Sequence, residues 1–194
     1  RDIFSRVVYG ARISLQIGII AIGLALLIGV PLGVLAGYFG GWIDEVIMRV
    51  TDVFLSFPPL LLALAISVTL GPSLSNAMIA IAIAWWPWYT RILRGEINSV
   101  KERSFVEAAR SSGSSPLRIM YHHLLRNSLT PIIVQASIDF GSIILTSASL
   151  SFLGLGAQPP TPEWGLMIST GRTYFLTKWW IVTFPGMAIF FTVY

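Results

Sequence analysis

The stretch Ile13–Ile43, ISLQIGIIAIGLALLIGVPLGVLAGYFGGWI, contains no charged residue. About 20 residues of apolar helix suffice to cross the hydrocarbon core of a bilayer, so this stretch predicts a membrane-spanning helix. The rest of the chain agrees, because 55% of its 194 residues are hydrophobic, only 11% are charged, and the mean hydropathy is +0.75. So few polar groups cannot cover the surface of a soluble globule. We therefore predict an all-α, polytopic transmembrane helical bundle.

Further uncharged stretches predict further spans. The stretch 53–90 is divided by Gly71-Pro72-Ser73, which predicts a hairpin of two spans. The predicted spans are 13–43, 53–70, 75–90, 129–155 and 180–194. We expect one transmembrane domain over 1–194, with no soluble domain. The chain opens on Arg1-Asp2 and stops at Tyr194 inside an apolar stretch, so we expect a fragment truncated at both ends.

Several kinds of site are excluded by composition. The net charge of +4 comes from basic residues between apolar stretches, without a separate basic domain, so we expect no nucleic-acid partner. With no cysteine there is no thiolate metal site or cysteine nucleophile. His122 and His123 are adjacent, about 100° apart on a helix, and cannot chelate a metal as an i, i+4 pair does. No Gly-rich loop ends in Gly-Lys-Ser or Gly-Lys-Thr, so we expect no nucleotide site in this chain.

The stretch 91–126 determines the predicted orientation. It carries seven Lys or Arg residues, which favours a cytoplasmic loop and places Arg49 inside as well. The basic residues then predicted on the outside are Arg1, Arg6, Arg12, Arg172 and Lys178. The aromatic residues just before the loop predict an aromatic belt at the inner headgroups, formed by Trp85, Trp86, Trp88 and Tyr89.

Within this loop, residues 104–125 predict a helix–turn–helix. Ser104 and Glu107 have the spacing of a capping box at a helix start. Gly113 is placed to end that helix in a left-handed conformation. Ser115-Pro116 would then cap and begin a second helix.

These residues also carry a family resemblance. Glu107-Ala108-Ala109, followed by Gly113 and by His123-Leu124-Leu125, resembles the EAA loop of bacterial ATP-binding-cassette (ABC) importer permeases. Further stretches resemble the C-type permease subunit of dipeptide, oligopeptide and nickel importers, namely 1–6 leading to 10–15, then 37–44, 150–156 and 162–165. Two residues depart from the family pattern: Arg126 stands where such loops usually have Pro, and Ser147 stands where a Glu is expected.

The resemblance implies a type I ABC importer transmembrane domain without catalytic residues of its own. Such a subunit forms half of the pathway for dipeptides, oligopeptides or nickel in the cytoplasmic (inner) membrane of a bacterium or archaeon. The implied partners are a second permease in a heterodimer, two ATPase subunits that bind ATP and magnesium, an external substrate-binding protein and the lipid bilayer. The residues expected to couple to the ATPase are Phe105, Glu107, Ala108, Ala109, Gly113 and His123.

Some alternatives stay open at this point. Asp139 lies within a predicted span, where a charge is costly, so it either faces the pathway or hydrogen bonds at a helix interface. Gly29, Gly33 and Gly37 form one helix face without side chains, which favours packing inside this chain over contact with a partner permease. A membrane channel or an intramembrane enzyme is the alternative function, although an enzyme needs at least two converging groups and only Asp139 is an acid within a span.

The stretch 159–178 is predicted to lie outside the bilayer on the external face. Pro159-Pro160-Thr161-Pro162 cannot continue a helix. A short interfacial helix is expected over 164–174, with Glu163, Arg172 and Lys178 in water.

Overall fold

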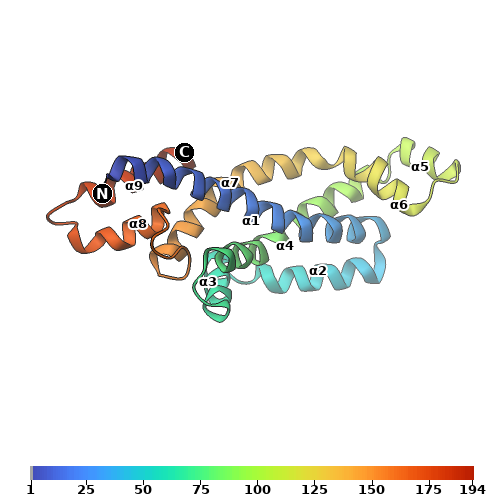
Figure 1. The fold of residues 1–194 in the computed structure, drawn as a ribbon. Coiled ribbons are helices and arrows are strands. Elements are labelled where there is room, and N and C mark those ends of the chain that lie inside the picture. Colours follow the sequence, from blue (N-terminus) through green and yellow to red (C-terminus); the bar gives the residue numbers. More distant parts are fainter. Residues whose placement is uncertain (1) are drawn as a thin grey trace. The chain divides into compact units, whose positions relative to one another are not determined.

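The computed structural model describes residues 2–194, and every regular element among them is helical (Figure 1). The elements are α1 (Ile3–Phe39), α2 (Gly41–Leu55), α3 (Pro59–Leu70), α4 (Leu74–Val100), α5 (Ser104–Ser111), α6 (Pro116–Arg118), the π-helix η1 (Ile119–Leu125), α7 (Leu129–Phe152), α8 (Trp164–Gly171), the 3₁₀ turn η2 (Arg172–Tyr174) and α9 (Trp180–Val193). The all-α prediction is therefore confirmed. Arg1, predicted on the external side, lies outside the described residues.

The chain forms two compact units. The first unit comprises residues up to Leu24, Pro58–Ala84 and Ile138–Tyr194, and the second comprises Ala25–Phe57 and Trp85–Ser137. Three helices, α1, α4 and α7, contribute residues to both units.

Two helices, α1 and α7, are long and apolar enough to cross a membrane. The pair α2 and α3 is bent by 88° at its break and adds a third candidate if it is one broken span. The ends of the helices differ from several predicted span boundaries. The helix predicted over 13–43 begins at Ile3 and ends at Phe39, because Gly40 and Gly41 adopt positive φ angles of 66° and 54°.

The stretch 53–70 is not one helix, since α2 ends at Leu55 and α3 begins at Pro59. Proline fixes its own φ and lacks an N–H, which suits Pro59 to a helix start. The break predicted at Gly71 is confirmed, where φ is +87° and the Asn76 amide donates to the Leu70 carbonyl (2.8 Å). After this break α4 continues to Val100, so Arg91 and Arg94 are helical residues and the loop begins later than predicted.

In the second unit, α1 packs closely on α4 along its glycines. A Cβ added at Gly33 would lie 2.9 Å from the Leu93 Cβ, and one added at Gly37 would lie 2.7 Å from the Ile97 Cβ. The Thr90 hydroxyl donates to the Gly29 carbonyl (3.1 Å). Packing inside the chain, favoured from the sequence, is therefore confirmed.

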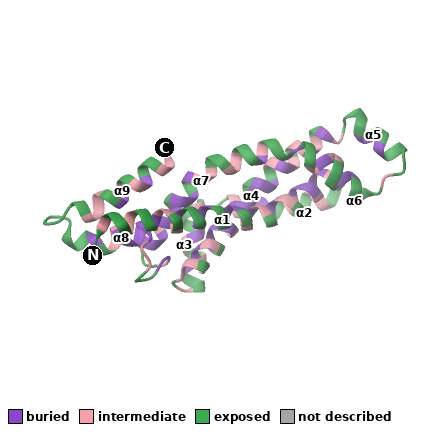
Figure 2. Ribbon diagram, turned by 45° about the horizontal axis from the view of Figure 1, so that its top comes forward, coloured by how far each residue is buried: buried purple, intermediate pink, exposed green. Residues whose placement is uncertain are grey.

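This packing overturns most of the predicted aromatic belt. Trp85, Trp86 and Tyr89 are buried, and only Trp88 is exposed. The Trp86 ring contacts Phe54 at 5.3 Å between centroids. Figure 2 shows the buried residues repeating along α4, while α5 is mostly exposed. Three of these four rings therefore lie in the protein interior.

In the first unit, α8 packs against α7 and α9 around a cluster of buried side chains. The cluster contains Ala148, Trp164, Met167 and Ile189. Trp164 also donates from Nε1 to the Val7 carbonyl of α1 (2.9 Å). The short helix predicted over 164–174 is thus present as α8 and η2, and it is largely buried along α8.

Glu163 does not lie in water, contrary to the sequence prediction. Its side chain is only 1% exposed and accepts a hydrogen bond from the Leu166 N–H (2.8 Å), so it caps the start of α8. Burial raises the pKa of Glu163 above its ordinary value, while hydrogen bonds from the Leu166 and Gly165 N–H groups and the Ser151 hydroxyl oppose the shift. A capping role explains why an acid is tolerated in this interior.

Candidate functional site

The helix–turn–helix over 104–125 is present in the second unit, although its first cap differs from the prediction. Arg103 is the N-cap of α5, with extended backbone angles, and no side chain caps this end. Ser104 is therefore already helical, and the predicted capping box with Glu107 was wrong. Glu107 instead lies exposed in the first turn, where a negative charge favours the positive end of the helix dipole.

The C-terminal end of α5 follows the sequence prediction. Gly113 has a φ of +75°, which glycine adopts without strain. The Ser114 N–H donates to the Ala109 carbonyl (3.1 Å) and the Gly113 N–H to the Arg110 carbonyl (2.9 Å). These two bonds form a Schellman motif, which ends the helix and turns the chain sharply.

The second helix begins at Pro116, capped by the Ser115 side chain, which accepts from the Arg118 N–H (3.4 Å). It continues as the π-helix Ile119–Leu125, which buries Ile119, Met120 and Leu124. Such wide turns occur frequently at functional sites.

The burial of α5 divides the predicted coupling residues into two groups. Val106 is fully buried and Ala109 is 8% exposed, so both anchor α5 to the rest of the loop. The residues that face outward are Phe105, Glu107, Ala108 and Gly113. His123 is half-buried on η1, and its carbonyl accepts from the Asn127 amide (2.6 Å). An outward face with one large ring and small residues beside it permits close approach of another helical surface.

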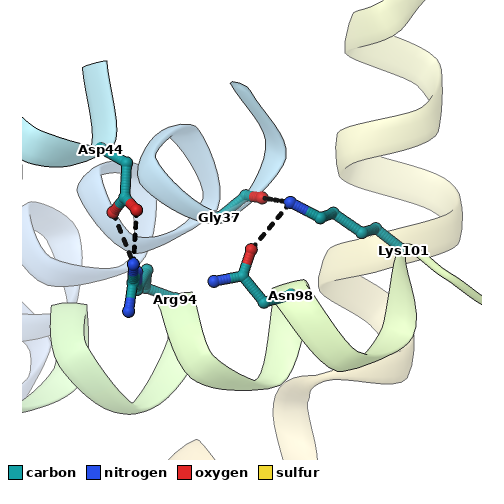
Figure 3. A network of polar contacts seen from close by, with 5 residues as sticks. All are labelled: Gly37, Asp44, Arg94, Asn98 and Lys101. Carbon is teal, nitrogen blue, oxygen red and sulfur yellow. Dashed lines mark hydrogen bonds and ion pairs between the residues drawn. The ribbon is translucent and has the colours of Figure 1, made fainter. Parts of the chain in front are cut away.

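A polar network anchors the segment that leads into the loop (Figure 3). Arg94 of α4 makes two hydrogen bonds to Asp44 of α2, one of them from Nε to Oδ1 (2.8 Å). Lys101 donates from Nζ to the Gly37 carbonyl in the last turn of α1 (2.9 Å) and to Asn98 Oδ1 (2.8 Å). A cation at this position satisfies a free carbonyl at the negative end of the α1 dipole.

The loop itself contacts the same end of α1. The Arg110 guanidinium lies over the Tyr38 ring, 5.8 Å from its centroid. Lys101, ahead of α5, and Arg110, in the last turn of α5, both contact the last turn of α1. Sequence reasoning missed these contacts, although Tyr38 and Asp44 lie in the stretch 37–44 that carries part of the family resemblance.

The remaining predicted positions lie elsewhere. Asp139 is half-buried on α7, in the first unit, and Ser147, on the same helix, is buried. Among residues 2–194 there is no group of three or more His, Cys, Asp or Glu side chains that could hold a metal ion.

The arrangement of helices defines the class of protein. The fold matches that of a chain of the MetNI methionine ABC transporter in an inward-facing conformation, with a TM-score of 0.78 over 98% of this chain and 91% of that chain, at 19% identity. The fold is therefore that of a type I ABC importer transmembrane domain. Residues 29–194 match the family described as "Binding-protein-dependent transport system inner membrane component", and the chain belongs to this family.

Curated relatives are similar over the whole of this chain. They include the dipeptide transport system permease protein DppC of Alkalihalophilus pseudofirmus (52% identical), the di/tripeptide transport system permease protein DppC of Pseudomonas aeruginosa (46%) and the glutathione transport system permease protein GsiD of Pectobacterium atrosepticum (45%). The chain spans 64% of the length of each of these relatives.

Proposed function

We propose that this chain is a permease subunit of an ABC importer and forms half of a translocation pathway for dipeptides or oligopeptides. The observation that carries the proposal is the folded loop 104–125, which turns Phe105 and Ala108 outward beside the exposed Gly113. The relatives named for dipeptide, di/tripeptide and glutathione transport favour a peptide cargo over nickel. The chain has no covalent chemistry to perform.

The partners follow from this proposal. Two ATPase subunits would bind ATP and magnesium, and the outward face of α5 would dock on one of them. Lys101 and Arg110 connect this loop to the end of α1, so a displacement of the loop would be passed to a helix long enough to cross the membrane. A second permease would complete the pathway in a heterodimer, and an external binding protein would deliver the cargo. The protein would reside in the cytoplasmic membrane of a bacterium or archaeon, and its chain would cross this membrane several times.

Uptake into reconstituted vesicles tests the function. The full-length protein, reconstituted with its co-purifying permease and ATPases, should accumulate a labelled dipeptide only when ATP and the binding protein are present. A passive channel would instead conduct without ATP, and accumulation of nickel but not of dipeptide would show that the proposed cargo is wrong.

In the same assay Asp139→Asn should lower uptake severalfold if Asp139 faces the pathway, with ATPase association unchanged.

The orientation is tested by cysteine labelling in intact cells, since the chain has no native cysteine. Thr173 and Ser111 are both exposed, so a cysteine at either position should be reactive wherever the reagent has access. Thr173→Cys is expected to react with an impermeant thiol reagent added outside, whereas Ser111→Cys should react only after the cells are opened. Labelling of Ser111→Cys alone in intact cells would reverse the proposed topology.

A further inference from the structure

An apolar groove lies at the second helix of the loop 104–125, and the proposed function does not involve it. It is a cavity of about 250 Å³ between α1 and the second helix of the loop, lined among others by Val30, Pro31 and Val34 on one side and by Leu117, Met120 and Leu125 on the other. Leu117 is 75% exposed and Tyr121, at the edge of the groove, is 68% exposed. All of these residues belong to the second unit.

A second cavity, of about 270 Å³, adjoins this groove. The two share Tyr121 and Leu125, but the second is lined also by His122, Arg126 and Leu129. An apolar surface therefore continues directly into one that carries a cation and an imidazole.

Two basic side chains, His122 and Arg126, line this second cavity, and Arg118 precedes them in the sequence. Arg118, His122 and Arg126 are spaced four residues apart along α6 and η1, and all three are exposed. Because the π-helix has a wider turn than an α-helix, residues four apart come close to the same side. We call these three residues the basic stripe.

The basic stripe has no acidic counterpart within the described part of the chain. The ion pairs formed by residues 2–194 use Glu45, Asp52 and Asp44, with Arg49, Arg91 and Arg94. Arg118 and Arg126 are therefore free to pair with an anion from outside the chain.

The position of the stripe indicates which anion. Arg126 lies just before Leu129, where α7 begins, and α7 is apolar enough to cross a bilayer. In the proposed orientation, on which this step rests, Arg126 lies at headgroup level on the cytoplasmic side, where anionic lipids attract Lys and Arg.

We propose that the groove and the basic stripe bind one anionic phospholipid of the inner leaflet. The acyl chain would lie against Pro31, Val34 and Leu117, and the phosphate would pair with Arg126 and His122, with Arg118 nearby. Arg126, which departs from the EAA pattern by replacing Pro, then has a role in lipid recognition. The proposal goes beyond peptide transport and does not depend on the docking of α5.

The test compares phosphatidylglycerol with phosphatidylcholine of the same acyl chains. The full-length protein, with its co-purifying subunits, is titrated with each lipid in detergent, and bound lipid is counted by native mass spectrometry. We expect a severalfold preference for phosphatidylglycerol. The variant Arg118→Gln/His122→Gln/Arg126→Gln should lose this preference, so that it binds both lipids equally. Arg12→Gln, an exposed arginine of α1 that lines neither cavity, is the matched control and should keep it.

A second variant separates the groove from the stripe. Leu117→Ser should weaken binding of both lipids while the ratio between them is kept, and Leu117 is exposed enough to be replaced without unfolding. Inorganic phosphate at millimolar concentration should not displace the lipid. The proposal is wrong if both lipids bind equally to the wild type, if the triple variant keeps the preference, or if phosphate alone competes. It is equally wrong if the triple variant loses ATPase association with its lipid preference unchanged, because the stripe would then be a subunit interface.

Discussion

Replacing Ala108 with aspartate is expected to abolish ATP-driven uptake while leaving the helix–turn–helix folded. Ala108 is exposed on α5 next to Phe105, so the folded chain accepts a larger side chain there. In the proposed complex the same position lies in a close helical contact, where an unpaired carboxylate is costly to bury. A loss of about 2 kcal/mol or more in association corresponds to a fall of about thirtyfold or more in ATPase binding. Pull-down of the ATPase and vesicle uptake measure the two effects.

Two further variants make this result specific. Ser99→Asp adds the same charge at an exposed position of α4 ahead of the loop and should leave association and uptake unchanged. Ala109→Asp places the charge one residue further on, at a side that the chain itself covers, so it should unfold the loop and increase its cleavage by protease. Normal ATPase association of the Ala108→Asp variant would contradict the docking role of α5.

The features that the sequence predicted well are local ones. Gly71 and Gly113 end helices because a positive φ requires glycine at that single position, whatever surrounds it. Ser115-Pro116 begins a helix for similarly local reasons. The uncharged stretches identified α1 and α7, since length and apolarity alone decide whether a helix can cross a membrane.

The features that the sequence did not predict depend on distant contacts. Asp44 and Arg94 look like residues of polar loops, yet α2 and α4 bring them together across 50 positions and make both helical. Glu163 looks like a surface acid, but α8 uses it as a buried cap. Within the candidate site, the sequence placed both Phe105 and Ala109 among the expected coupling residues, whereas the packing of η1 against α5 covers Ala109 and leaves Phe105 partly exposed.

The largest loss of stability is expected from the smallest change, Gly165→Ala. A Cβ added at Gly165 would lie 2.2 Å from the Ala148 carbonyl oxygen and 2.5 Å from the Ala148 Cα. Both atoms are backbone of α7, so no side-chain rotation relieves the overlap, and α8 must move away from α7. Because Trp164 and Met167 lie on either side in the buried cluster, that movement also opens their packing. We expect a cost of about 3 kcal/mol, at the upper end for overpacking.

The matched control for this change is Gly23→Ala. Nothing lies within 4 Å of a Cβ added at Gly23, which is within α1. Alanine favours a helix over glycine by about 1 kcal/mol, so this variant should be as stable as the wild type or more stable. The midpoint of thermal unfolding in detergent measures both variants, with protease resistance as a second readout. Equal midpoints for Gly165→Ala and Gly23→Ala would mean that α8 does not pack on α7 through their backbones, and that the first unit is packed more loosely around α8 than the contacts at Gly165 require.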